Sequence, residues 1–82
     1  MNEIIIRLIL EQDKDIDVSR IEAFPNEPLS NTAGFDSLDY MGFIDSIEEE
    51  FGVVVEEGDY PQMMSLASVK AWLESKKVQK NG

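Results

Sequence analysis

The chain has 82 residues, a length typical of one small domain, and 43% of them are hydrophobic, which is enough for a folded core. Seventeen acidic against seven basic residues give a net charge of −10, which repels nucleic acids and anionic membranes and favours protein partners with basic surfaces. The absence of Cys and His excludes disulfides, thiolate or imidazole zinc sites and the Ser-His and Cys-His pairs of nucleophilic enzymes.

The first element is an apolar run over 4–10. Its β-branched residues suit a strand, but Ile5, Leu8 and Ile9 share one helical face, and no second clear strand is available for pairing. We therefore expect a helix over 3–12. Seven residues cannot span a hydrocarbon core of about 30 Å, so we expect a cytoplasmic protein without membrane insertion.

Residues 13–35 contain several turn-forming residues and lack a sustained hydrophobic period, which predicts a long loop. Widely spaced apolar residues are expected to pin this loop to the core: Val18, Ile21, Phe24 and Leu29.

The predicted loop begins with Asp13, Asp15 and Asp17, an alternation that resembles the start of a calcium-binding loop. The sixth position is Val18 where the turn needs Gly, and the twelfth is Phe24 where a bidentate Glu is required. We interpret the segment as a solvated acidic turn and expect no metal site.

The strongest helix signal follows, with apolar residues at helical spacing and Gly52 as the expected C-terminal glycine. Asp36 is a suitable N-cap, and Asp39 can act as the acidic partner in a capping box, so we predict a helix over 37–51. Gly42 in its middle costs about 1 kcal/mol relative to Ala, which indicates either tolerance or a close approach by another group.

Ser37 is thus predicted to lie in the first turn of this helix, beside backbone N–H groups that lack helical partners. Such groups, together with the positive end of the helix dipole, favour a bound or attached anion. Leu38 and Met41 lie near Ser37 on the flank of the apolar stripe. They either form a semi-exposed contact surface or complete the core, and the sequence leaves both possibilities open.

Two further helices are predicted, a short one over 59–64 and a last one over 67–77, with Ser65 or Ser68 as the cap of the latter. The tail 78–82 is expected to fray. Their apolar residues are expected to face the core: Met63, Met64, Leu66, Val69, Trp72 and Leu73.

Charge is concentrated around the second helix, because residues 36–59 hold nine acids and no Lys or Arg. On the helix itself the acids occupy the face opposite the aromatic stripe, so an acidic surface begins beside Ser37. A charge run alone would indicate only a solvated face.

These features together resemble the acyl carrier protein family. The stretch 34–39, Gly-Phe-Asp-Ser-Leu-Asp, is similar to the Gly-x-Asp-Ser-Leu-Asp motif of that family, and Ser37 falls on its modified serine. The likeness continues through 47–52, at the acidic end of the second helix, and through the opening of the last helix.

The resemblance implies an all-α fold over a single domain, 1–82: a small four-helix bundle of acyl-carrier type with a long loop between helices 1 and 2 and a short third helix. It implies a covalent 4′-phosphopantetheine on Ser37, with Asp36 and Leu38 as motif neighbours, whose thiol holds acyl groups as thioesters. Because the chain offers no base to activate Ser37, we expect a carrier with no catalytic residues. A separate phosphopantetheinyl transferase, using coenzyme A and a metal ion, must attach the group.

The resemblance also implies partners, namely acyl-processing enzymes of fatty-acid, polyketide or specialised lipid biosynthesis that carry basic docking patches. The carrier itself is expected to be a monomer. Gly42 stands where many fatty-acid carriers have an acid, and Tyr40 and Phe43 are bulkier than expected there, so a specialised pathway is equally open. The docking candidates are Asp36, Asp39, Met41, Asp45, Glu48 and Glu49.

Two other functions remain open from the sequence. An aminoacyl or peptidyl carrier uses the same modified serine but usually has a less acidic helix. An unmodified acidic helical adaptor would share only the fold, with Ser37 as an ordinary residue of the first turn.

Overall fold

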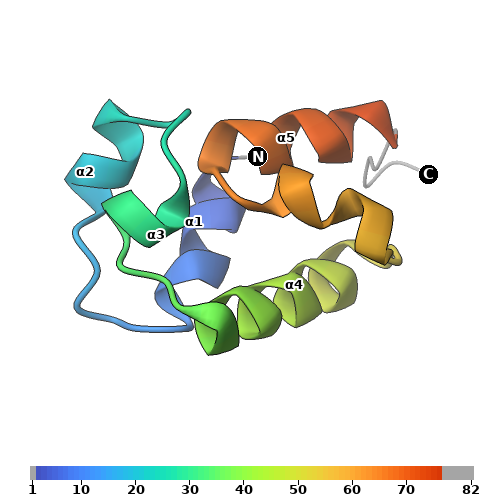
Figure 1. Cartoon of the computed structure of the whole chain (residues 1–82), viewed down its shortest axis with the longest axis horizontal. Helices are drawn as coiled ribbons and strands as arrows, with labels where there is room; N and C mark the ends of the chain where they lie inside the picture. Colours follow the sequence, from blue (N-terminus) through green and yellow to red (C-terminus); the bar gives the residue numbers. More distant parts are fainter. Residues whose placement is uncertain (1, 77–82) are drawn as a thin grey trace.

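The computed structural model describes residues 2–76, and this part of the chain is all-α (Figure 1). The predicted four-helix arrangement is confirmed by the four longer helices, to which two short ones are added. In chain order the elements are α1 (Asn2–Leu10), α2 (Val18–Ala23), α3 (Leu29–Thr32), α4 (Ser37–Phe51), the 3-10 helix η1 (Glu57–Met63) and α5 (Leu66–Ser75).

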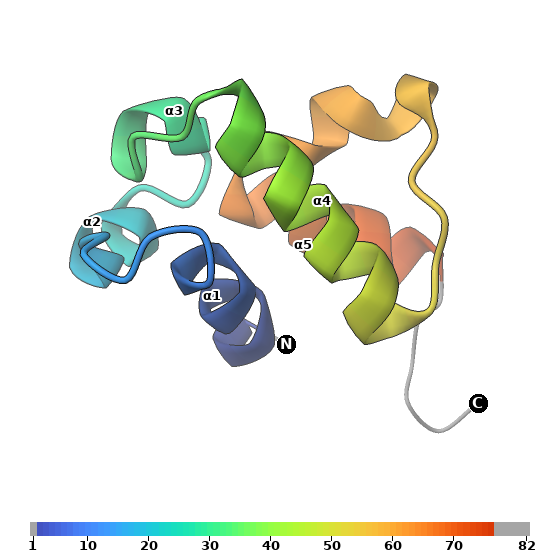
Figure 2. The same cartoon turned by 90° about the horizontal axis from the view of Figure 1, so that it is seen from below.

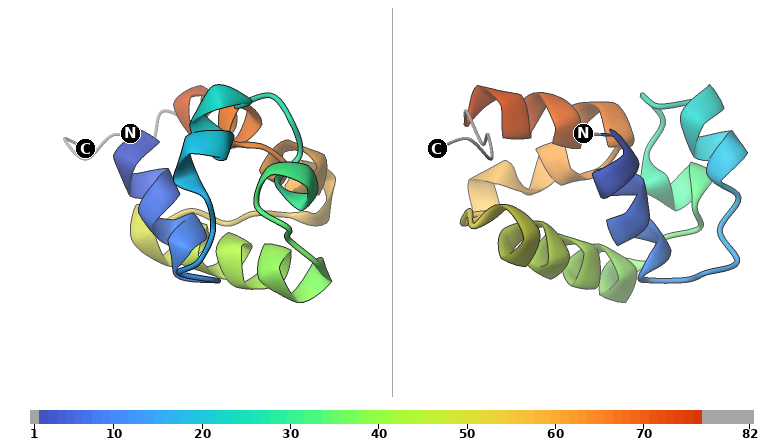
Figure 3. Two further views of the ribbon diagram at one scale, coloured as in Figure 1. Left: turned by 90° about the vertical axis from the view of Figure 1, so that its left-hand side faces the viewer. Right: turned by 180° about the vertical axis from the view of Figure 1, so that it is seen from behind.

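The core lies between α1, α4 and α5, and α1 packs against both of the other helices. In Figure 1, α4 and α5 lie on opposite sides of the molecule with η1 between them; the right-hand view of Figure 3 shows α1 crossing in front. Each fully buried apolar side chain stabilises the folded state by about 1.5–3 kcal/mol relative to an exposed one. The three helices contribute Ile5, Ile9, Phe43, Ile47, Val69 and Leu73, all with no exposed surface.

The first helix ends at Leu10, two residues before the predicted end at 12. The Gln12 N–H donates to the Ile9 carbonyl in a tighter turn, and the Gln12 side-chain amide donates to the Leu8 carbonyl at 3.2 Å. The Gln12 carboxamide also lies so close to Gly42 that a Cβ at residue 42 would collide with it. The glycine in the middle of α4 therefore marks a close approach by the Gln12 side chain, two residues after the end of α1.

The connection over 13–35 is long, as predicted, but it is not loop throughout, because α2 and α3 form within it. The Asp17 side chain caps α2 by accepting from a backbone N–H two residues later at 3.0 Å. Helices of six and four residues are too short to display a helical period, which is why the pattern missed them. Ile21 and Leu29 do anchor the segment in the core, whereas Phe24 is 53% exposed and does not.

The predicted short helix over 59–64 is the 3-10 helix η1, which begins at residue 57 and ends at residue 63. Glu56 precedes it in an extended conformation and forms a capping box with Asp59, whose carboxylate accepts from the Glu56 N–H at 3.1 Å. Met63 is buried as predicted, but Met64 is 38% exposed. Its backbone instead links the end of η1 to α3, because the Met64 carbonyl accepts from the Leu29 N–H at 2.7 Å.

The last helix begins at Leu66, one residue before the predicted start, because Ser65 rather than Ser68 is the cap. The Ser65 hydroxyl accepts from the Ser68 N–H at 3.1 Å, and the Ser68 hydroxyl accepts from the Ser65 N–H at 3.1 Å. The predicted inward residues Val69, Trp72 and Leu73 are buried. Residue 77 and the tail 78–82 lie outside the described residues.

Candidate functional site

The start of α4 has the geometry that the sequence predicted. Asp36 is extended at φ −106° and ψ −172°, and its carboxylate accepts from the Asp39 N–H at 2.9 Å. Asp39 completes the capping box by accepting from the Asp36 N–H at 3.0 Å. Ser37 is consequently fixed as the first residue of α4, and its side chain is exposed.

An exposed hydroxyl in this place suits a phosphodiester. The neighbouring first-turn N–H groups and the positive end of the helix dipole favour negative charge, and an external enzyme can reach the oxygen. The chain has no His or Cys, so Ser37 cannot belong to a nucleophilic pair of the usual kind. The site therefore fits attachment of a phosphate-linked group better than internal catalysis.

Tyr40 braces this site, a role that the sequence did not indicate. Its hydroxyl accepts from the Ser30 N–H of α3 at 2.8 Å and donates to the Met64 carbonyl after η1 at 3.4 Å. Its ring meets Phe35 edge-on at 5.1 Å between centroids, and Phe35 meets Phe43 edge-on at 5.8 Å. Figure 2 shows α3 beside the start of α4, the position in which these contacts hold it.

The apolar neighbours of Ser37 face solvent. Leu38 is 77% and Met41 62% exposed. The alternative that they complete the core is thereby excluded, and two large apolar side chains are left exposed beside Ser37.

The predicted docking acids divide into two groups. Asp45 and Glu49 are exposed on α4, and neither is engaged by a hydrogen bond or ion pair among the described residues. Glu48 is half-buried and its carboxylate accepts from the Val55 N–H at 2.8 Å, so it also holds the segment after α4. Asp36 and Asp39 serve the capping box as well.

The acidic turn over 13–17 satisfies its own backbone. The Asp15 N–H donates to the Asp13 carboxylate at 2.9 Å, and Asp17 caps α2. Within residues 2–76 no three acidic side chains gather in a way that would hold a metal ion. Over the same residues, every helix is too short or too polar to cross a membrane.

A small helical domain with an exposed serine at a capped, acidic helix start defines a class of carrier domain, and comparison with known proteins identifies it. The family described as "Phosphopantetheine attachment site" matches residues 4–74. A protein named acyl carrier protein, from Nitratidesulfovibrio vulgaris (strain DSM 19637 / Miyazaki F), is 29% identical over 76 residues, which cover 93% of this chain and 96% of that protein.

The chain belongs to the family of phosphopantetheine-attachment domains. Its prosthetic group is a covalently attached 4′-phosphopantetheine. Members of such a carrier family are generally not catalysts themselves, and they interact with phosphopantetheinyl transferases and acyl-processing enzymes.

Proposed function

We propose that Ser37 is the residue that carries 4′-phosphopantetheine and that the chain 1–82 is a single carrier domain. The observation that carries the proposal is the exposed Ser37 hydroxyl at the first residue of α4, inside the capping box of Asp36 and Asp39. When attached, the group supplies a thiol that holds acyl cargo as a thioester. The chain itself contributes attachment and presentation, and it is not an enzyme.

Attachment requires an external phosphopantetheinyl transferase. The Ser37 oxygen attacks the phosphorus of coenzyme A that bears the pantetheine, a P–O bond to serine forms, and the bond to the departing adenosine bisphosphate breaks. The serine proton passes to a base on the transferase, since this chain supplies no such base. First-turn N–H groups of α4 favour the new phosphodiester charge.

The exposed surface of α4 would then dock processing enzymes. Leu38 and Met41 offer apolar contact beside Ser37, while Asp45 and Glu49 offer charge to a basic patch. Complementary charge raises association rates more than affinity, which suits a carrier that must leave each enzyme quickly. The cargo is an acyl intermediate of fatty-acid, polyketide or specialised lipid biosynthesis, handled by a monomeric cytoplasmic protein.

Intact mass measurement tests the attachment site. Incubation with a broad-specificity transferase and coenzyme A should add one phosphopantetheinyl group to the wild type and to Ser30→Ala, in which another exposed serine is removed, but none to Ser37→Ala. Modification of Ser37→Ala to the wild-type extent would refute the assignment. No modification of the wild type would favour an unmodified adaptor.

A further inference from the structure

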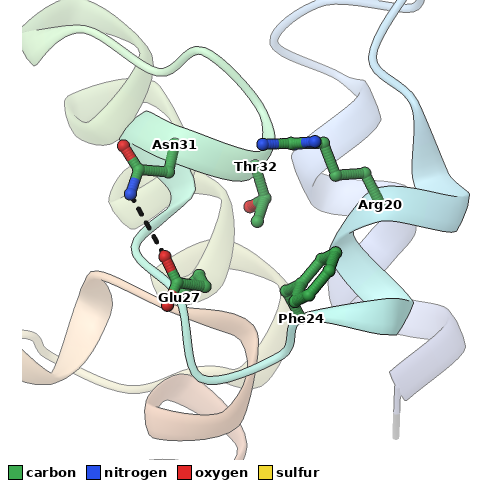
Figure 4. A pocket seen from close by; sticks show the side chains of 5 residues that line it. All are labelled: Arg20, Phe24, Glu27, Asn31 and Thr32. Atoms are coloured by element: carbon green, nitrogen blue, oxygen red, sulfur yellow. Dashed lines mark hydrogen bonds between the residues drawn. The ribbon is translucent and has the colours of Figure 1, made fainter.

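A small pocket lies between α2 and α3, away from the acidic face of α4. It has a volume of about 200 Å³ and is lined by Arg20, Phe24, Glu27, Asn31 and Thr32 (Figure 4). Pockets for drug-sized ligands have about 300–1,000 Å³. This one therefore suits a short segment of a ligand rather than a whole molecule.

Thr32 is the unexplained group in this pocket. The residue is 5% exposed, and its hydroxyl has no hydrogen-bond partner within residues 2–76. Figure 4 shows its side chain projecting from α3 into the space between Arg20, Phe24 and Glu27. Buried hydroxyls in proteins are almost always hydrogen-bonded, so an unpartnered one that faces a pocket indicates that a polar group is to be accommodated there.

The other lining residues define the chemistry of that group. Arg20 has no ion pair among the described residues, and its guanidinium lies over the Phe24 ring at 6.0 Å from the centroid, with donors left to offer. The Glu27 carboxylate accepts from the Asn31 amide at 3.2 Å and supplies further acceptor capacity. One positive and one negative group disfavour a strongly charged ligand, whereas an amide presents both a carbonyl and an N–H.

The start of α4 is close to this pocket along the chain and in space. Ser37 follows Thr32 by five positions, so their Cα atoms lie at most about 18 Å apart. The hydrogen bond from the Ser30 N–H to Tyr40 ties α3 directly to α4 at 2.8 Å. A long flexible arm on Ser37 can therefore reach α3, and tethering gives it a local concentration of the order of mM.

We propose that this pocket holds an amide-bearing segment of the chain's own phosphopantetheine arm, an inference that rests on the proposed attachment at Ser37. The Thr32 hydroxyl and the Arg20 guanidinium donate to an amide carbonyl of the arm, and Phe24 covers its apolar part. Docking here keeps the arm against the carrier between visits to processing enzymes, on the side of α3 rather than on the exposed apolar and acidic surface of α4.

The test uses holo-protein whose modification has been verified by intact mass, with a nitroxide on the arm thiol and NMR detection of backbone amides. The nitroxide should broaden the amides of Arg20, Phe24 and Thr32. Thr32→Val, which removes the hydroxyl at nearly constant volume, should reduce this broadening at least twofold. Ser19→Ala, which removes an exposed hydroxyl from α2 outside the pocket, should leave it unchanged.

Complete modification with broadening confined to residues beside Ser37 would overturn the proposal, and so would equal broadening in Thr32→Val and wild type. The latter result would mean that the arm does not use the Thr32 hydroxyl. If Thr32→Val unfolds, Arg20→Gln on the exposed side of α2 provides the same comparison. Absence of any mass gain would instead refute the attachment at Ser37, which separates the two failures.

Discussion

Tyr40→Phe removes the hydroxyl that ties α3, α4 and the end of η1 together and keeps the ring that meets Phe35 edge-on. A hydrogen bond contributes about 0.5–1.5 kcal/mol net. Ser30 is exposed, so water can satisfy its N–H after the substitution, and the 3.4 Å contact to the Met64 carbonyl is long. We therefore expect a loss of about 1 kcal/mol in the free energy of unfolding, rather than the larger penalty of a buried unpaired donor.

Urea denaturation and thermal unfolding measure this loss. In a domain of this size 1 kcal/mol corresponds to a fall of about 4–8 °C in Tm. The matched control is Tyr60→Phe, because Tyr60 is 45% exposed and its hydroxyl has no hydrogen bond within residues 2–76. Hydrogen exchange at the Ser30 amide should quicken in Tyr40→Phe alone. If both variants lose the same stability, or neither loses any, the brace is not a stabilising contact.

Three further predictions concern α4 and the charge of the chain. Gly42→Ala should change the free energy of unfolding in urea little, because a helix-propensity gain of about 1 kcal/mol is offset by displacement of the Gln12 side chain. In a Gln12→Ala background the same substitution should stabilise the fold by about 1 kcal/mol. Equal effects in both backgrounds would exclude the contact. Raising NaCl from about 10 to 150 mM shortens the Debye length from about 30 to 8 Å and should raise Tm, so an unchanged midpoint would mean that self-repulsion is unimportant. Glu49→Lys should slow loading by an acyl-processing enzyme without lowering Tm. Asp39→Lys should slow loading and also cost about 1 kcal/mol of stability through the lost capping partner. Unaffected kinetics in both variants would place docking elsewhere.

The features that the sequence predicted well depend on residues close together in the chain. The N-cap of α4 needs only Asp36 and Asp39, and its end needs only Gly52, which adopts the left-handed conformation at φ 65°. The 15 residues between them are long enough to show a helical period. The candidate site, an exposed serine in the first turn of this helix, was therefore predictable in its local geometry.

The features that were missed depend on contacts between distant residues or on very short elements. Tyr40 meets Ser30 and Met64, which are 10 and 24 positions away, and nothing in the residue types specifies that pairing. Gly42 signalled a close approach, but its partner, Gln12, could be identified only from the packing of the folded chain. The short helices α2 and α3 are stabilised by burial of Ile21 and Leu29 rather than by a periodic face.

The structure also changes how the acidic helix should be interpreted. Sequence pattern treats all its carboxylates as one docking surface, yet Asp39 holds the helix start and Glu48 holds the backbone of Val55. Reversal of either charge would disturb the fold and the proposed docking together, so a kinetic defect would be ambiguous. Asp45 and Glu49 lack such partners in the described part of the chain, which makes them the residues whose substitution separates the proposed electrostatic docking from the stability of the carrier.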